Sequence, residues 1–409
     1  MRGLSAIPAV LCTAAVLTAA GCSGPAAPAA SAPGSTAPSS GSPTSPAPVS
    51  ASTPTPTATR PSPTPTVPPS TRFKDPSGQL VRSVNRYATG RAPKQVAFTP
   101  DGKELWVTLL GGDGVAVHNA VSGAKLAAIR LGRHGGAVEV IFTRDGSTAY
   151  VSQMETHTVW QVDVASRRVQ RSVDVEGAWT KVLSLSPDER TLYAANWISH
   201  DVSVIDLPSW RVREVIPTVH TPRGLYPSPD GRSLYVAGYD NGELARIDLR
   251  SGKQKLLLRT GGAMRHLVGD GRRLYSSDMG TASVYVVDLA SAKVRRLARV
   301  DDHPNTIDLS PDGRVLYVSC RGRNNPKSYY IPGPEWGSVV VLDARTGRPL
   351  DAIVAGNQTT GLDISDDGGL LAISDFLDNR IRLYTVPPYE KLAGGNGGFW
   401  SGHRAVLTK

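Results

Sequence analysis

One short phrase recurs along this chain and limits the folds open to it. Each copy centres on an Asp-Gly turn or a variant of it, and the aspartates of the copies are Asp101, Asp145, Asp188, Asp230, Asp270, Asp312 and Asp367. Successive copies are 44, 43, 42, 40, 42 and 55 residues apart. A period near 42 residues, with four strand-like runs in each, is typical of a β-propeller. The seven copies therefore predict seven blades, and we interpret their aspartates as turn residues.

The two ends of the repeat array indicate how a ring would close. Residues 80–84 form a strand-like run before the first full repeat, and the last repeat has only three strands, the third ending at Thr385. We expect the N-terminal run to complete the seventh blade beside residues 381–385, which removes an open sheet edge. The predicted fold is all-β, a seven-bladed β-propeller over residues 72–390 closed by an N-terminal strand. Residues 391–409 are Gly-rich, lack a repeat partner and are expected to form a loosely packed tail.

The amino-acid sequence of the repeats resembles that of a known family. Residues 310–318 read Ser-Pro-Asp-Gly-Arg-Val-Leu-Tyr-Val, and the apolar strand Val339 to Asp343 follows in the same repeat. This grammar is similar to that of the YVTN-type seven-bladed propellers, and more broadly to the lactonase-like propellers, over roughly residues 78–388. The resemblance implies a secreted or surface-associated bacterial repeat protein on a fold that some enzymes also use. Because function lies in sites and not in folds, the resemblance assigns no reaction.

The first 71 residues differ in composition from the repeats. An apolar run from Ile7 to Ala20 is too short for a permanent membrane span and predicts a lipoprotein signal peptide over residues 1–21. It ends in Ala-Ala-Gly-Cys22, which resembles a bacterial lipobox and makes Cys22 the predicted lipidation site; ordinary secretion, with an incidental thiol, is the alternative. Residues 22–71 are mostly Pro, Ser, Thr, Ala and Gly and predict a disordered linker. We therefore expect an extracytoplasmic protein, lipid-anchored to the outer side of the bacterial cell membrane.

Charge and cysteine content narrow the partners. The net charge is +10; residues 1–71 supply Arg2, Arg60 and no acid, so 43 basic and 35 acidic side chains leave +8 on the rest. No nucleic-acid-binding motif accompanies this charge, so the expected partner is an anionic small molecule, a wall polymer or a protein, not a nucleic acid. Removal of Cys12 with the signal peptide and lipidation of Cys22 would leave Cys320 as a half-buried strand cysteine.

Aligning the repeats on their turns places several cations at the start of the innermost strand. The column contains Lys94, Lys181, Arg223, Asn305 and, if the fifth repeat has lost two turn residues, Arg265, with Val138 and Thr360 as exceptions. In a propeller the innermost strands begin around the mouth of the central channel. The column therefore predicts an anion-binding funnel, and the alternative is a solvated rim.

Two further features are expected on the same face. A polar residue followed by a large one recurs after the second strand, and this pattern fits a pocket wall and a packed loop equally well. The sixth repeat carries a Pro-rich insertion over residues 321–336 with Tyr329, Tyr330 and Trp336, which we interpret as a lid or wall over the funnel. The candidate ligand-binding residues are Lys94, Lys181, Trp197, Arg223, Tyr239, Arg265, His266, His303, Asn305, Arg321, Tyr330 and Trp336.

The sequence assigns no catalytic residue. Six titratable residues are expected near the channel: Glu139, His266, Asp278, His303, Asp308 and Asp363. None has the spacing of a known motif, so neither a metal nor a cofactor is expected. Three functions follow: an anion-recognising binding or interaction propeller, which we favour, an extracytoplasmic lactonase- or lyase-like enzyme, and a cofactor-bearing redox propeller. The enzyme would need a His and a carboxylate at one spot in the funnel, and the redox protein would need axial ligands across a large cavity.

Overall fold

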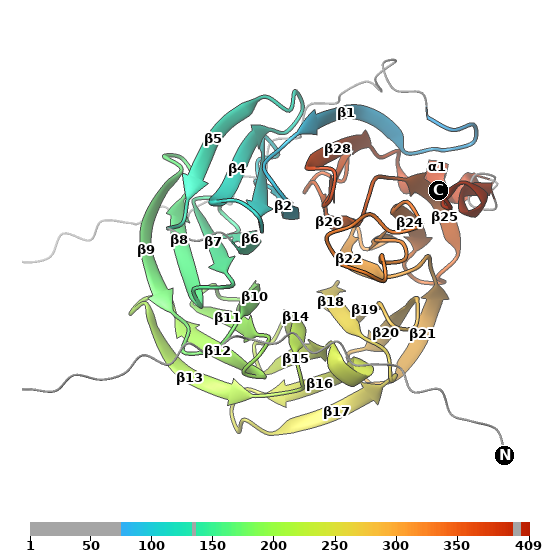
Figure 1. Ribbon diagram of the computed structural model, residues 1–409. Coiled ribbons are helices and arrows are strands. Elements are labelled where there is room, and N and C mark those ends of the chain that lie inside the picture. Colours follow the sequence, from blue (N-terminus) through green and yellow to red (C-terminus); the bar gives the residue numbers. More distant parts are fainter. Residues whose placement is uncertain (1–74, 133–135, 396–401) are drawn as a thin grey trace, which may run out of the picture. The chain divides into compact units, whose positions relative to one another are not determined.

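The structure, a computed structural model, describes residues 75–132, 136–395 and 402–409. Within these residues, 28 strands form seven antiparallel sheets of four strands each, and Figure 1 shows the sheets as blades around a common centre. The predicted all-β, seven-bladed fold is confirmed. The signal peptide, the linker and Cys22 lie outside the described residues. In the part of the chain that is described, no helix is long and apolar enough to cross a membrane.

The strands follow the chain from the innermost to the outermost position of each blade. Blades one to four contain, in order, β2 (Pro93–Phe98), β3 (Glu104–Leu109), β4 (Gly114–Asn119), β5 (Lys125–Arg130); β6 (Ala137–Phe142), β7 (Thr148–Gln153), β8 (Thr158–Asp163), β9 (Arg168–Asp174); β10 (Thr180–Leu185), β11 (Thr191–Asn196), β12 (Asp201–Asp206), β13 (Arg211–Pro217); β14 (Pro222–Pro227), β15 (Ser233–Gly238), β16 (Glu243–Asp248), β17 (Gln254–Arg259). Blades five to seven contain β18 (Met264–Gly269), β19 (Arg273–Asp278), β20 (Ser283–Asp288), β21 (Val294–Arg299); β22 (Pro304–Leu309), β23 (Val315–Cys320), β24 (Ser338–Asp343), β25 (Pro349–Val354); β26 (Thr359–Ile364), β27 (Leu370–Asp375), β28 (Arg380–Thr385) and β1 (Arg82–Ala88). The described residues also contain the short helical segments η1 (Asp240–Gly242), α1 (Tyr389–Gly394) and η2 (Arg404–Val406).

The N-terminal strand closes the ring as predicted. β1 pairs antiparallel with β28, from Arg82 opposite Thr385 to Ala88 opposite Arg380, and becomes the outer strand of blade seven (Figure 1). The segment before it is also attached, because Asp351 Oδ2 on β25 accepts hydrogen bonds from the N–H groups of Leu80 and Val81, both at 2.8 Å. This pairing removes the sheet edge that blade seven would otherwise expose.

The repeated aspartates are turn residues, as interpreted from the sequence. In blade three, Asp188 Oδ1 accepts hydrogen bonds from Ser186 Oγ at 2.5 Å and from the Arg190 N–H at 3.1 Å. The Ser186 hydroxyl is the main reason that the pKa of Asp188 is lowered. Asp230 and Asp312 bind the equivalent serine and backbone groups. These carboxylates hold the link between the first two strands of each blade.

The core consists of apolar layers between neighbouring blades. One cluster joins Tyr193 and Val204 of blade three to Leu234 and Val236 of blade four. Another joins Val84 of β1 to blades seven and one, so ring closure buries apolar surface as well as pairing backbone. Each fully buried aliphatic side chain contributes about 1.5 to 3 kcal/mol relative to exposure.

A β-bulge at the start of every innermost strand determines what faces the channel. The pairing of β10 with β11 passes from Thr180 to Val182 and skips Lys181, and the first two strands of the other six blades show a similar irregularity at this place. A bulge leaves the extra residue outside the ladder and redirects its side chain. The second residue of each innermost strand, which is the column aligned from the sequence, is skipped in all seven blades, and in four of them the third residue is skipped as well.

The expectation of a loosely packed tail is wrong for the described residues 391–395 and 402–409. Leu392 is fully buried in the apolar layer of blades six and seven. His403 is also fully buried, with Nε2 at 2.6 Å from Asp301 Oδ2, and the Trp336 N–H donates to the Leu407 carbonyl at 2.8 Å. The tail has no repeat partner, but it packs on the insertion of blade six instead.

Candidate functional site

The predicted column of cations converges at one end of the channel. Lys94, Arg223 and Arg265 are the second residues of β2, β14 and β18, and together with Asn305 and Thr360 they line one cavity. These three cations are 7–8% exposed and Arg321 is 3% exposed. The structure also confirms the alignment of Arg265 within the worn fifth repeat. Lys94, Arg223, Arg265 and Arg321 are therefore buried and do not form a solvated rim. Lys181, the other cation of the predicted column, is only partly buried and does not line this cavity.

These cations repel one another and have no acidic partner at contact distance. Among the described residues, ion pairs within 4.0 Å include none of Lys94, Lys181, Arg223, Arg265 and Arg321. Burial lowers the pKa of Lys94 well below its usual value, and the charges of Arg265, Arg321 and Arg223 lower it further. Two buried guanidinium nitrogens, Nε of Arg223 and Nε of Arg321, have no hydrogen-bond partner. Buried charge without a counter-charge costs several kcal/mol, so the cluster favours a bound anion.

Glu139 lies next to this cluster without neutralising it. Its side chain is 7% exposed and lines the same cavity. Burial raises the pKa of Glu139 to about 8, although the positive charges of Arg223 and Lys94 act in the opposite direction. At neutral pH the group is therefore mostly protonated. Even when ionised, it would balance only one of the buried cations.

Aromatic side chains form the wall above the cations. Lys181 Nζ lies 3.5 Å from the ring centroid of Trp197, and Arg265 Cζ lies 5.6 Å from that of Tyr239. The centroids of the Trp197 and Tyr239 rings are 5.0 Å apart. The residue before Trp197 points elsewhere: Asn196 Nδ2 donates to Asp201 Oδ1 at 2.7 Å inside blade three. In blade three the recurring pair of residues thus supplies a wall from Trp197 and a loop anchor from Asn196.

The insertion of blade six contributes differently from what its sequence indicates. Tyr329, which is absent from the predicted site residues, accepts a hydrogen bond from Lys94 Nζ at 3.0 Å. Tyr330 is 66% exposed on the same loop. Trp336 packs with the tail, where Lys409 Nζ lies 4.5 Å from its ring centroid. Trp336 therefore braces the loop and is not placed among the cations.

The two predicted histidines occupy different positions. His266 follows Arg265 and lines the cavity with Glu139, and burial lowers its pKa to about 4. The Nδ1 atoms of both histidines have no hydrogen-bond partner. Burial is also the main cause that lowers the pKa of His303, followed by the charge of Arg321. His303 does not line the cation cavity.

Asp278 and Cys320 have structural environments. Asp278 accepts hydrogen bonds from Thr260 Oγ1 at 2.5 Å and from the Ala263 N–H at 2.8 Å. Cys320 ends β23 and is fully buried, not half-buried, and burial raises the pKa of its thiol. Within the described ranges no group of three or more His, Cys, Asp or Glu side chains is arranged to hold a metal.

A second cavity, of about 450 Å³, opens at the other end of the innermost strands. It shares Gln95, Glu139 and His266 with the cation cavity, and its far end carries Asp308 and Asp363. The remaining lining is largely apolar and includes Phe142 and Leu362. The channel is thus basic at one end and acidic at the other.

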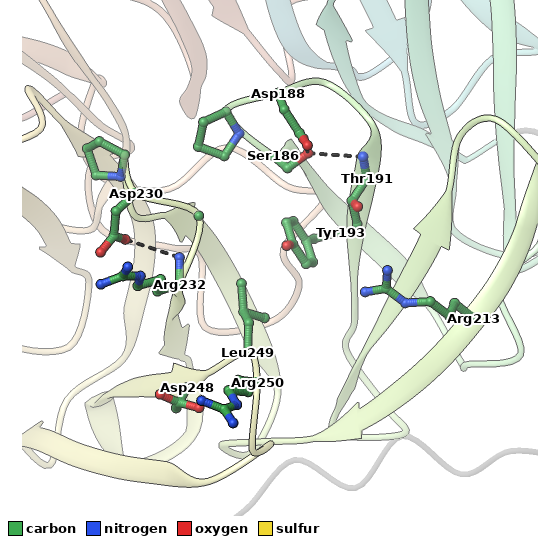
Figure 2. Close-up of a pocket in the computed structure, with 13 residues that line it drawn as sticks. Ser186, Asp188, Thr191, Tyr193, Arg213, Asp230, Arg232, Asp248, Leu249 and Arg250 are labelled. Carbon is green, nitrogen blue, oxygen red and sulfur yellow. Dashed lines mark hydrogen bonds between the residues drawn. The ribbon is translucent and has the colours of Figure 1, made fainter.

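A larger hollow, of about 990 Å³, lies between blades three and four, away from the cation cluster (Figure 2). Its polar side chains already form hydrogen bonds within the turns. Figure 2 shows that Asp230 accepts a hydrogen bond from the Arg232 N–H and that Ser186 accepts one from the Thr191 N–H. Because repetition alone produces such a groove between turns, we assign no site to it.

Comparison with known proteins identifies the family. A sequence profile described as "Lactonase, 7-bladed beta-propeller" matches residues 78–262. The chain is 38% identical over 323 residues to Antigen Lp49 of Leptospira interrogans serogroup Icterohaemorrhagiae serovar copenhageni, an alignment that covers 76% of this chain and 71% of that protein. This chain belongs to the lactonase-like seven-bladed β-propeller family. The resemblance found in the sequence is therefore confirmed.

Solved structures support the fold of this lactonase-like propeller. A chain of Kuenenia stuttgartiensis hydrazine synthase aligns with a TM-score of 0.63 at 20% identity and covers 72% of this chain and 96% of that one. The β-propeller domain of Cps50 (Swd1) from Myceliophteria thermophila aligns with a TM-score of 0.60 at 16% identity and covers 74% and 100% of the two chains. At such identities these matches show architecture only.

Proposed function

We propose that this lactonase-like propeller is an extracytoplasmic, lipid-anchored binding protein that recognises an anionic ligand at the basic end of its channel. The observation that supports it most is the burial of Lys94, Arg223, Arg265 and Arg321 with no carboxylate in ion-pair contact among the described residues. Repetition of the fold does not require these cations, since Val138 and Thr360 occupy the same position in other blades. An anion would offset their repulsion and accept from the unpartnered guanidinium nitrogens.

Calorimetric titration and thermal unfolding at low salt test this binding. Chloride, phosphate, acetate, succinate and benzoate form the panel, because they differ in size and charge. A ligand present at 100 times its Kd stabilises the folded state by about 2.7 kcal/mol. We expect this gain for at least one anion with the wild type and its loss in the Arg223→Ala/Arg265→Ala double variant. High salt should reduce the difference, because it screens the attraction.

A matched control removes two arginines elsewhere. Arg232 and Arg250 are exposed and lie at the groove between blades three and four. Arg232→Ala/Arg250→Ala changes the net charge by the same amount and should bind the anion as the wild type does. Equal loss in both double variants, or no response of the wild type to any anion, would refute the proposal.

The anchor rests on residues outside those described and has its own test. Cys22 follows the apolar run that predicts a signal peptide. The relative Antigen Lp49 is named as an antigen, which is in keeping with display outside the cell. Cys22→Ala should move the protein from the membrane fraction to the medium or soluble fraction, whereas Cys12→Ala should not. Membrane association that survives Cys22→Ala would show that lipid does not hold the protein.

A second candidate function is hydrolysis or lyase chemistry on an anionic substrate. It is favoured by the placement of His266 and Glu139 on the same stretch of channel, beside the cations. With a pKa of about 4, His266 is neutral at pH 7, and with a pKa of about 8, Glu139 is mostly protonated. In these states His266 can accept a proton and Glu139 can donate one. Turnover of γ- or δ-lactones followed by pH-stat, and its loss in His266→Ala and Glu139→Gln, would support this function; wild-type turnover at the buffer rate would exclude it for these substrates.

A further inference from the structure

Tyr329 fills the place above the cations where a ligand would bind. The insertion between β23 and β24 places its phenolic oxygen 3.0 Å from Lys94 Nζ. The same phenol acts electrostatically on Arg223 and Arg265, raising the pKa of each against the larger effect of burial. The tyrosine oxygen thus contacts the cation of blade one and lies near enough to those of blades four and five to act on them electrostatically.

The surroundings of the Tyr329 ring are those of a bound aromatic group. The Arg321 guanidinium carbon lies 4.2 Å from the ring centroid, and Phe376 meets the ring edge to face with centroids 5.2 Å apart. Gln358 Nε2 donates to the Tyr329 carbonyl at 2.7 Å and so fixes the backbone behind the ring. Cation–π stacking and an edge-to-face contact are interactions that proteins use to hold flat ligands.

Little room is left when Tyr329 is in place. The cavity bounded by Lys94, Arg223, Arg265 and Asn305 has a volume of about 10 Å³, which corresponds to about one water molecule. This space is too small for an organic anion. Because Tyr329 contacts Lys94 and Arg321, departure of its side chain is the movement that would open a larger place beside these cations. The rest of the loop is held independently, because the Trp336 N–H donates to the Leu407 carbonyl and the Lys409 N–H to the Pro334 carbonyl.

We propose that Tyr329 is an internal substitute for the ligand, and that the ligand is an aromatic carboxylate of about the size of benzoate which displaces it. This inference rests on the anion-binding function proposed above and specifies the ligand. The ring of the ligand takes the place between Arg321 and Phe376, and its carboxylate takes the place of the phenolic oxygen. A hydroxyl offers the cluster an acceptor, whereas a carboxylate also offers the counter-charge that the cations lack.

Tyr329→Ala should open this place without removing a cation. In calorimetric titrations at low salt, benzoate should bind Tyr329→Ala about tenfold more tightly than the wild type, as small aromatics fill an engineered cavity. Acetate, which lacks the ring, should gain less than about threefold, and p-cresol, which lacks the charge, should bind more weakly than benzoate. Tyr330→Ala is the matched control, because Tyr330 is on the same loop, is 66% exposed and leaves Tyr329 in place. Tyr329→Phe retains the ring and should not show the benzoate gain.

A second measurement uses the wild type and does not depend on the variant folding. Lys327 is exposed two residues before Tyr329, so displacement of the tyrosine by benzoate should speed tryptic cleavage after Lys327, whereas acetate should not. Equal binding of acetate, phosphate and benzoate by Tyr329→Ala would overturn the aromatic class but leave the anion site standing. Binding of p-cresol as tight as that of benzoate would overturn the role of charge. Failure of the wild type to bind any anion would refute the proposed function itself.

Discussion

The two ends of the channel carry opposite charges, and they differ in whether the charged groups have hydrogen-bond partners. At the acidic end, Asp308 and Asp363 are the fifth residues of β22 and β26. Asp308 accepts from the N–H groups of Ile364 and Leu309 at 3.0 and 2.8 Å, and Asp363 accepts from that of Phe98 at 2.7 Å. At the basic end, the Nε atoms of Arg223 and Arg321 have no hydrogen-bond partner.

This difference separates structural charges from those available to a ligand. The two aspartates connect blade six to blade seven and blade seven to blade one, where the ring closes, so their oxygens are already used by the main chain. The cations make no comparable link to a neighbouring main chain through those nitrogens. Polar groups that stabilise a fold are generally satisfied within it, and unsatisfied buried donors call for an explanation. We therefore expect the cations of the basic end to lower the stability of the ligand-free protein and to remain available for a ligand.

The largest effect expected from this comparison is on stability at the acidic end. Asp308→Ala/Asp363→Ala leaves three backbone N–H groups without their acceptors and should lower the free energy of unfolding by about 3 to 5 kcal/mol. Urea denaturation measures this change. Asp366→Ala is the control, since Asp366 is an exposed neighbour at the same cavity and should cost less than about 0.5 kcal/mol. A loss below 1 kcal/mol for the double variant would show that these aspartates do not hold the ring together.

The repeat made much of this comparison predictable from sequence. A fixed period places equivalent residues at the same height around one axis, so aligning the turns was sufficient to bring Lys94, Arg223 and Arg265 together. Their inward direction depends on the bulge at the start of each inner strand, which the alignment does not reveal.

Features outside the repeat were not predictable in the same way. Tyr329 lies in an insertion that has no register with any other blade, so nothing in the sequence relates it to Lys94, 235 residues away. The packing of the tail was not predicted for the same reason, because the contact of His403 with Asp301 joins residues that are 102 positions apart. Gln358 precedes β26 and binds the Tyr329 carbonyl, and only the folded loop connects the two.

The pH dependence of stability should differ in sign between the two aspartates of the acidic end and the two lysines of the basic end. Burial raises the pKa of Asp308 from 3.8 to about 6 and that of Asp363 well above 3.8. The folded state then holds more protons than the unfolded state above pH 4, so the stability that this end contributes is full below about pH 4 and is lost as pH rises through about 6. Lys94 and Lys181 have lowered pKa values and act oppositely, adding stability as pH rises towards 10.5.

Unfolding free energies between pH 4 and 7 measure this slope. Asp308→Asn/Asp363→Asn keeps the acceptors and removes the titration, so it should flatten the fall by about 1 to 2 kcal/mol after solvent screening is allowed for. Lys94→Met, at the basic end, should leave this acidic limb as it is in the wild type. If the Asn double variant retained the full slope, the titrating groups would lie elsewhere.

The smallest effect is expected at the basic end, and its sign is informative. Without a ligand, burial removes Arg265 from water, and the charges of Arg223 and Arg321 repel it. Burial is the larger of these effects, and both lower the pKa of Arg265. Arg265→Met keeps an apolar stem against Met279 and Tyr239 while it removes one of the mutually repelling charges. Replacing a poorly compensated buried charge with an apolar side chain is often neutral or stabilising, so we expect the free energy of unfolding to rise by about 0 to 1 kcal/mol. Urea denaturation in low salt measures it, and Arg232→Met at the exposed groove should change stability by less than about 0.5 kcal/mol. A loss above 1 kcal/mol for Arg265→Met would mean that the folded protein already compensates this charge, and the contrast between the two ends would then disappear.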